Sequence, residues 1–147
     1  MDKTHNFIIA PGRWTGEGKI SLNMVAEELP FTMNWIISEK DSSGKIQSTQ
    51  ELQIQGLSEG MSNELFFYDF SSNKFSVEMD NSNVGKVLGI GLLTDKIIAW
   101  EFRENDLNFE GFETYKYNKD GSYYIHGEYI TTDQLRTQIE GKIWREK

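Results

Sequence analysis

Residues 107–131 read LNFEGFETYKYNKDGSYYIHGEYIT, a stretch in which apolar and polar side chains alternate on both sides of Asp120-Gly121. An alternation with a period of two is typical of β-strands, and Asp-Gly is typical of tight hairpin turns. We therefore predict an antiparallel hairpin formed by residues 107–117 and 122–131.

The same pattern continues along most of the chain. Alternating segments recur at a spacing of about 8–12 residues, and short turn-forming segments separate them. The predicted strands lie near residues 13–26, 31–38, 45–55, 61–70, 74–80, 85–93, 96–104, 107–117, 122–131 and 135–145. Short connections favour pairing between consecutive strands, and a meander of this length exposes two edges unless it closes. The prediction is an all-β domain, a single antiparallel up-and-down β-barrel over residues 13–147, preceded by an N-terminal segment at 1–12.

The turn at Asp120-Gly121 also predicts which residues face one another. A two-residue turn pairs Tyr115 with His126 and Glu113 with Glu128. Residues that pair directly lie on the same face of an antiparallel sheet. The four side chains therefore form one group, whichever face they occupy.

Two further turns indicate which face that is. Two-residue turns at Thr94-Asp95 and Glu104-Asn105 place the group on the face that carries Trp100 and Phe109, which is apolar enough to be the barrel interior. A single loop of odd length would reverse this assignment, because a shift of one residue moves every side chain to the other face. The competing inward row is also largely apolar, and consists of Phe112, Thr114, Ile125, Gly127 and Tyr129.

Aromatic residues dominate the predicted interior. Trp35 and Trp100 belong to inward rows, and Tyr68 lies in another inward row together with Phe66 and Phe70. A barrel of about ten strands is wider than an eight-stranded one and tends to leave a cavity. An aromatic cavity suits a small apolar or amphipathic molecule. The predicted ligand-binding residues are Trp35, Tyr68, Trp100, Phe109, Glu113, Tyr115, His126 and Glu128, with His126 and Glu128 anchoring a polar end.

Other functions fit the same residues. His126 beside two carboxylates could perform acid–base chemistry, so an enzyme is the second hypothesis. A satisfied hydrogen-bond network or a solvated face would give these residues no chemical role. The sequence favours a binding protein over an enzyme, and we expect no metal and no cofactor.

An outer strip of apolar residues raises a further alternative, a protein-interaction module with a filled barrel. Leu88, Ile90 and Leu92 occupy the face of their strand opposite Gly89 and Gly91. The strip could be covered by residues 7–9 of the N-terminal segment, or it could form a homodimer interface.

Composition narrows the partners and the location. The net charge of −8 argues against nucleic acid and anionic membranes as partners, because both require a basic face. There are no cysteines, which excludes disulfides and thiolate chemistry. Phe7, Ile8 and Ile9 are too few apolar residues for a signal-peptide core, and no segment resembles a membrane span. The expected location is the cytoplasm.

The segment Gly12-Arg13-Trp14-Thr15-Gly16-Glu17-Gly18 resembles the opening Gly-x-Trp strand of lipocalins and their calycin relatives. Its longer Gly-x-Trp-x-Gly-x-Gly form is similar to the start of nitrobindin-like barrels and of lipocalin-like domains of unknown function. Phe67-Tyr68-Asp69 and Trp144-Arg145 also match the latter group.

The resemblance implies a lipocalin-like barrel in which Trp14 packs at the closed end under a basic residue, here Arg145, in a cation–π contact. Nitrobindins hold haem through a histidine in the C-terminal part of the barrel. The strand from Leu135 to Arg145 has none, so haem is not expected.

Overall fold

The computed structural model describes residues 7–23, 28–56, 60–81, 85–103, 109–130 and 136–146. Within these ranges the regular structure consists of ten β-strands. They are β1 (Gly12–Leu22), β2 (Leu29–Ile37), β3 (Ile46–Ile54), β4 (Met61–Ser71), β5 (Lys74–Asn81), β6 (Gly85–Leu93), β7 (Ile97–Phe102), β8 (Glu110–Tyr117), β9 (Tyr123–Ile130) and β10 (Arg136–Arg145). The same ranges contain no helix that is long and apolar enough to cross a membrane.

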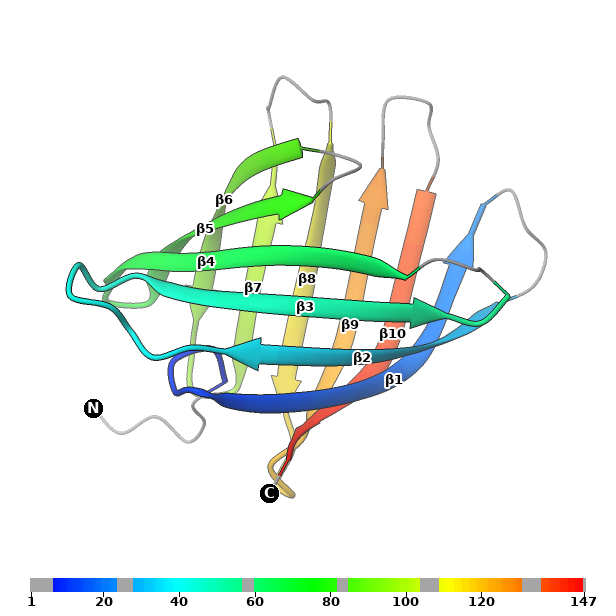
Figure 1. The fold of residues 1–147 in the computed structure, drawn as a ribbon, viewed down its shortest axis with the longest axis horizontal. Coiled ribbons are helices and arrows are strands. Elements are labelled where there is room, and N and C mark those ends of the chain that lie inside the picture. The colour runs from blue at the N-terminus through cyan, green and yellow to red at the C-terminus, as the bar shows by residue number, and fades with distance from the viewer. Residues whose placement is uncertain are drawn as a thin grey trace.

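The ten strands form a closed antiparallel barrel. Each strand pairs with its neighbours in sequence, and β1 pairs with β10 to complete the ring. In Figure 1, β1 to β4 cross in front of β7 to β10, so the core lies between two walls of a flattened barrel. The predicted fold class and up-and-down topology are confirmed.

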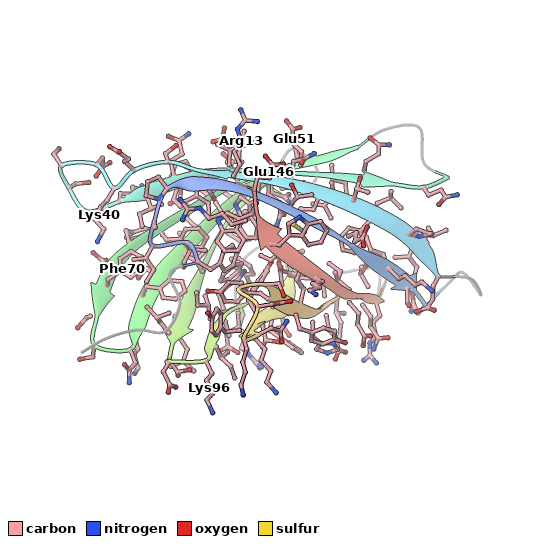
Figure 2. All side chains as sticks on the ribbon, turned by 90° about the horizontal axis from the view of Figure 1, so that it is seen from below. Arg13, Lys40, Glu51, Phe70, Lys96 and Glu146 are labelled. Carbon is pink, nitrogen blue, oxygen red and sulfur yellow. The ribbon has the colours of Figure 1, made fainter. Side chains whose placement is uncertain are left out.

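Alternation along the strands separates the core from the surface. Trp35 and Trp100 are the largest fully buried side chains, and their ring centroids lie 6.0 Å apart in a T-shaped contact. Tyr115 stacks on Trp100 at 5.0 Å. On the outside, Arg13 and Glu51 project away from the barrel (Figure 2). An aromatic layer therefore spans the interior from β2 to β8.

Two glycines allow the barrel to close. Gly18 of β1 lies directly opposite Gly141 of β10. A Cβ atom on Gly18 would lie 2.1 Å from the carbonyl oxygen of Glu140, and one on Gly141 would lie 2.4 Å from the carbonyl oxygen of Glu17. Contacts that short between a side chain and backbone are not tolerated, so the close approach of these strands requires glycine at both positions.

The N-terminal segment fills one end of the barrel. The side chains of Phe7 and Ile8 are fully buried. The Phe7 ring lies 4.9 Å from that of Trp14 and 5.2 Å from that of Trp35. The Phe7 N–H donates a hydrogen bond to the Tyr123 hydroxyl at 3.3 Å. Residues 7 and 8 therefore act as a plug at the end where β1 begins.

The position of this plug shows that one prediction for the outer apolar strip, its coverage by residues 7–9, is wrong. Residues 7–9 pack against the barrel core and do not cover Leu88, Ile90 and Leu92, whose exposed fractions are 59%, 64% and 44%. The reason is that Phe7 buries more aromatic contact inside the barrel than a flat outer strip could provide.

Trp14 and Arg145 meet at the same end of the barrel. They are directly paired across β1 and β10. The Arg145 guanidinium donates a hydrogen bond to the Pro11 carbonyl oxygen at 2.6 Å and lies over Gly12. A cation–π contact with Trp14 stays a prediction from the family resemblance.

Truncation of the plug should destabilise the protein far more than truncation of an outer aromatic residue. We expect Phe7→Ala to lower the free energy of unfolding by about 3–5 kcal/mol, because it empties a fully buried site. Phe66→Ala is the matched control, since Phe66 is only partly buried on the outer face of β4. Urea denaturation would measure both, and equal losses would contradict the assignment of Phe7 as a structural plug.

Candidate functional site

Three amide side chains form a row inside the barrel. Gln50, Asn63 and Asn81 are directly paired across β3, β4 and β5, and all three are buried. Asn81 donates to the Asn63 side-chain oxygen, and Asn63 Nδ2 donates to Gln50 Oε1 at 2.8 Å. The row ends where Gln50 Nε2 donates to the Met33 sulfur at 3.7 Å, which is a weak acceptor. Because sulfur accepts hydrogen bonds weakly, Gln50 Nε2 can still donate a stronger hydrogen bond to another group.

A carboxyl group lies inside the barrel on β8. Glu113 is buried, and its two oxygens accept hydrogen bonds from the hydroxyls of Tyr115 and Tyr129. Burial raises the pKa of Glu113 above its ordinary value, and the two tyrosine hydrogen bonds counter part of that rise. Burial and the nearby Glu113 raise the pKa of both tyrosines well above their ordinary value. Both tyrosines therefore stay protonated donors at neutral pH.

Aromatic rings surround this carboxyl group. Tyr115 stacks on Trp100, and Tyr129 stacks on Phe109 with ring centroids 5.2 Å apart. Trp100 lies directly opposite Glu113 in the register of β7 and β8. Among the buried side chains that the structure describes, Glu113 is the one that can carry a formal charge at neutral pH.

The interior also holds buried hydrogen-bond donors on three tryptophan side chains. The indole Nε1 atoms of Trp14, Trp35 and Trp100 are buried and have no hydrogen-bond partner within the described ranges. An unsatisfied buried donor costs about 1–3 kcal/mol. Together with Glu113, the indoles give the interior both hydrogen-bond donors and a hydrogen-bond acceptor.

The structure places His126 and Glu128 on the outer face, so their predicted interior position is wrong. Tyr115 pairs with Ile125, and Glu113 pairs with Gly127. The connection is a five-residue loop, in which the Gly121 N–H donates to the Asn118 carbonyl and the Asn118 N–H donates to the Ser122 carbonyl.

The conformation of Gly121 explains this shift. Its φ of 92° places it in the left-handed position of a bulged hairpin loop, whereas the prediction assumed a two-residue turn. The odd number of loop residues reverses the face of β9. The predicted acid–base group is therefore not assembled, because His126 and Glu113 point to opposite sides of the sheet.

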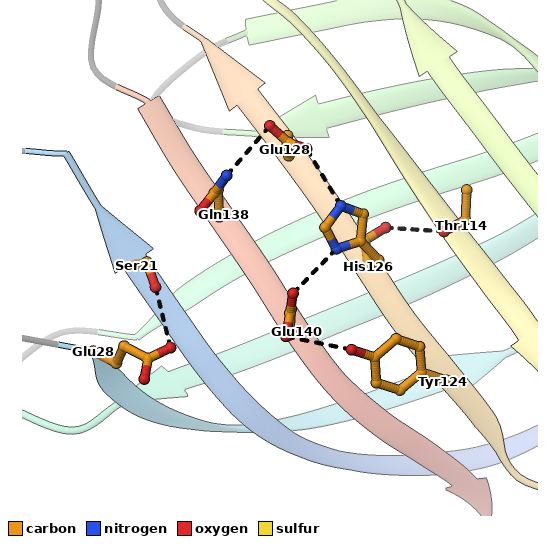
Figure 3. A network of polar contacts seen from close by, with 8 residues as sticks. All are labelled: Ser21, Glu28, Thr114, Tyr124, His126, Glu128, Gln138 and Glu140. Atoms are coloured by element: carbon orange, nitrogen blue, oxygen red, sulfur yellow. Dashed lines mark hydrogen bonds and ion pairs between the residues drawn. The ribbon is translucent and has the colours of Figure 1, made fainter.

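On the outside, His126 belongs to a surface network shown in Figure 3. Its Nε2 atom lies 3.3 Å from Glu128 and its Nδ1 atom lies 3.5 Å from Glu140. Tyr124 donates to Glu140 at 3.3 Å. The two carboxylates contact opposite nitrogens of the ring, so they do not converge on one point where a metal could bind. Exposed polar contacts of this kind contribute at most about 1 kcal/mol.

Tyr68 also lies on the outer face, contrary to the prediction that it lines the interior. The register of β4 and β5 shifts between Tyr68 and Ser71, and Asp69 in this irregular segment has a φ of 53°. Before the shift, Phe67 faces inward and Tyr68 faces outward, where the Lys45 amine lies 5.1 Å from the Tyr68 ring. The bulge returns Phe70 to a stacked contact with Phe75 at 5.4 Å. The prediction assumed regular alternation from Phe70 back to Tyr68. The bulge between Tyr68 and Ser71 breaks that alternation, so the two residues lie on different faces.

The remaining predicted residues lie in the barrel, namely Trp35, Trp100, Phe109, Glu113 and Tyr115. Their ligand-binding role stays a prediction. Sequence reasoning did not assign Gln50, Asn63, Asn81 or Tyr129 to the site. The signal for them was a polar residue at an inward position of an otherwise apolar row, such as Gln50 between Ser48 and Leu52.

A separate groove of about 860 Å³ lies across the outer surface of β1, β2, β3, β9 and β10. It is crossed by exposed or partly exposed polar side chains of both charges, including Glu17, Lys19 and Lys142. The groove opens to solvent above the glycine seam of Gly18 and Gly141. Its mixed charge and open shape identify no ligand class.

The buried carboxyl group should make stability depend on pH. Because the folded pKa of Glu113 is raised above 4.5, the native state keeps a proton that the unfolded chain releases. The protein therefore has its full stability below the pKa that Glu113 has in the unfolded chain. It loses stability as pH rises through the higher pKa that Glu113 has in the folded state. We therefore expect wild-type protein to lose stability relative to Glu113→Gln as pH rises above 4.5 in urea denaturation experiments.

The control for this experiment is Glu51→Gln, which makes the same change at an exposed position of β3. Its stability difference from wild type should change less with pH than that of Glu113→Gln, because the side chain of Glu51 is exposed. If the Glu113→Gln curve runs parallel to wild type, Glu113 is not held in the buried environment described above.

Comparisons with known proteins identify the fold but no family. No protein-family model and no curated protein sequence matches the chain. Among solved structures, the chain is similar to the S-type phycobiliprotein lyase CPES from Guillardia theta. The TM-score is 0.68 at 11% sequence identity, over 94% of this chain and 89% of that chain. The fold is therefore a lipocalin-like barrel, and the likeness extends over nearly the whole chain.

Proposed function

We propose that this protein binds one small amphipathic molecule inside its barrel. The observation that carries the proposal is the polar layer formed by Glu113, the two tyrosines that contact it, and the amide row that starts at Gln50. Burying polar groups costs free energy unless they are paired. A polar layer within an aromatic interior is the arrangement expected of a site that orients a ligand.

The aromatic layer would hold the apolar part of the ligand. Trp35 and Trp100 supply rigid apolar surface, and their indole N–H groups could donate to an oxygen or nitrogen atom of the ligand. Glu113 would accept a hydrogen bond from its polar end. In this proposal Glu113 takes the anchoring role that the sequence first suggested for His126.

The structural neighbour is compatible with this proposal without specifying the ligand. That protein is named a phycobiliprotein lyase, so a barrel of this fold can serve a protein that carries out chemistry. Among the described residues of the present chain, the buried side chains include one carboxylic acid, Glu113, and no basic group beside it. This composition favours binding over catalysis.

The proposal predicts saturable binding of N-phenyl-1-naphthylamine, an apolar dye whose fluorescence rises in apolar surroundings. Titration should show one site per chain, with energy transfer from tryptophan to the dye. Trp100→Arg should weaken binding at least about tenfold, because it replaces a wall of the site by a charge. Lys116→Ala, on the outer face of β8, should leave the dissociation constant unchanged.

Circular dichroism and gel filtration would establish that both variants are folded. If the dye fails to bind saturably, or if folded Trp100→Arg binds it as tightly as wild type, the interior is not a ligand site. Native mass spectrometry of freshly purified protein would add the mass of any retained molecule.

We also propose a homodimer through the outer strip of Leu88, Ile90 and Leu92. The observation in favour is the exposure of three large aliphatic side chains in a row on β6, where they remain uncovered by residues 7–9. Exposed apolar rows of this kind mark contact surfaces more often than isolated apolar residues do.

The dimer proposal predicts that Ile90→Lys shifts the protein from dimer to monomer in sedimentation velocity experiments. Ile36→Lys is the matched control, since Ile36 is an exposed isoleucine on the outer face of β2. A monomeric wild type, or an equal effect of both variants, would contradict this interface.

A further inference from the structure

The charge of the interior restricts the class of ligand. Glu113 lies between Trp100 of β7 and Gly127 of β9 in the register of the sheet. Neither neighbour carries a charge, and a Cβ atom on Gly127 would lie 3.0 Å from Glu113 Cγ. The titratable groups that face the carboxyl are Tyr115 and Tyr129, and both act as neutral donors. Glu113 therefore has no cationic partner among the described residues.

Among the described residues, the one basic side chain at an inward strand position makes its hydrogen bond elsewhere. Arg145 lies at the plugged end, where it is exposed and bound to the Pro11 carbonyl. Trp35, Tyr115 and the plug residue Phe7 occupy the interior beside that end. When Glu113 is ionised, none of the described residues therefore supplies a positive charge beside it.

Aromatic rings complete the surroundings of the carboxyl. Trp100, Tyr115, Phe109 and Tyr129 form two stacked pairs, one on either side of the Glu113 hydrogen bonds. The electron-rich faces of such rings attract organic cations, and the attraction grows when the cation is desolvated. A carboxylate accepts more hydrogen bonds than the two tyrosines provide.

We infer that the interior ligand is an organic cation, an amine or quaternary ammonium with an apolar tail, whose head group lies against Glu113. This inference rests on the proposed interior binding. A cation would neutralise a buried carboxylate, a neutral molecule would leave it unpaired, and an anion would repel it where water screens least. The net charge of −8 also attracts cations to the protein.

Three ligands that share a ten-carbon tail test the inference: decyltrimethylammonium, decanol and decanoate, each below its micelle concentration. Their displacement of N-phenyl-1-naphthylamine from the full-length protein at pH 7.5 gives three dissociation constants. The ammonium should bind at least about tenfold more tightly than decanoate, with decanol between them. Glu113→Gln should remove this order, and Glu51→Gln on the outer face should preserve it.

The possible outcomes distinguish a failure of the cation inference from a failure of the proposed interior binding. If neither the dye nor any of the three ligands binds, both fail. If all three bind with similar affinity, or if Glu113→Gln keeps the preference for the ammonium, the interior is a ligand site but Glu113 does not select a cation.

A second measurement avoids substitution altogether. The ratio of decyltrimethylammonium to decanol affinity in wild-type protein should fall as pH is lowered through the raised pKa of Glu113, because the carboxylate gains a proton while neither ligand titrates. A ratio that stays constant from pH 9 down to the acid limit of folding would overturn the inference, whether or not Glu113→Gln folds.

Discussion

The pairing of β1 with β10 is the contact on which the other features depend. It removes the two edges that an up-and-down meander would expose, and it requires Gly18 and Gly141 because no Cβ atom fits where the strands approach. Closure of the ring creates a barrel interior, and the side chains that point into it are removed from water. The aromatic layer, the buried carboxyl group and the plug at Phe7 are all consequences of that ring.

Much of this architecture follows from period-two alternation, which predicted about ten strands, their order and the closed ring. The inward assignment of Trp35 and Trp100 also followed, because the loops near them preserved parity even where the exact pairs differed. Trp100 lies opposite Glu113, for example, although a shorter turn had placed it opposite Phe109. An error of an even number of residues in register, four in this case, leaves every side chain on its face.

Errors of one residue do not. At Asp120-Gly121, a glycine with positive φ fits both a two-residue turn and a bulged loop, and the choice depends on hydrogen bonds that the dipeptide does not specify. That choice moved His126 and Glu128 to the surface. The bulge after Tyr68 had the same effect on β4. The amide row was missed for a different reason, since Gln50, Asn63 and Asn81 become one feature only when three strands are in register.

The polar groups in the interior lower the stability of the barrel. The buried carboxyl group of Glu113 opposes folding, and so do the indole N–H groups that lack a partner among the described residues; apolar residues of similar volume would fill the same space at less cost. The aromatic contacts of Phe7 with Trp14 and Trp35 act in the opposite direction. Two of the unsatisfied indoles, those of Trp14 and Trp35, therefore belong to the same packing that stabilises the plugged end. A barrel selected for stability alone has no reason to keep these polar groups, whereas a barrel that orients a polar molecule does.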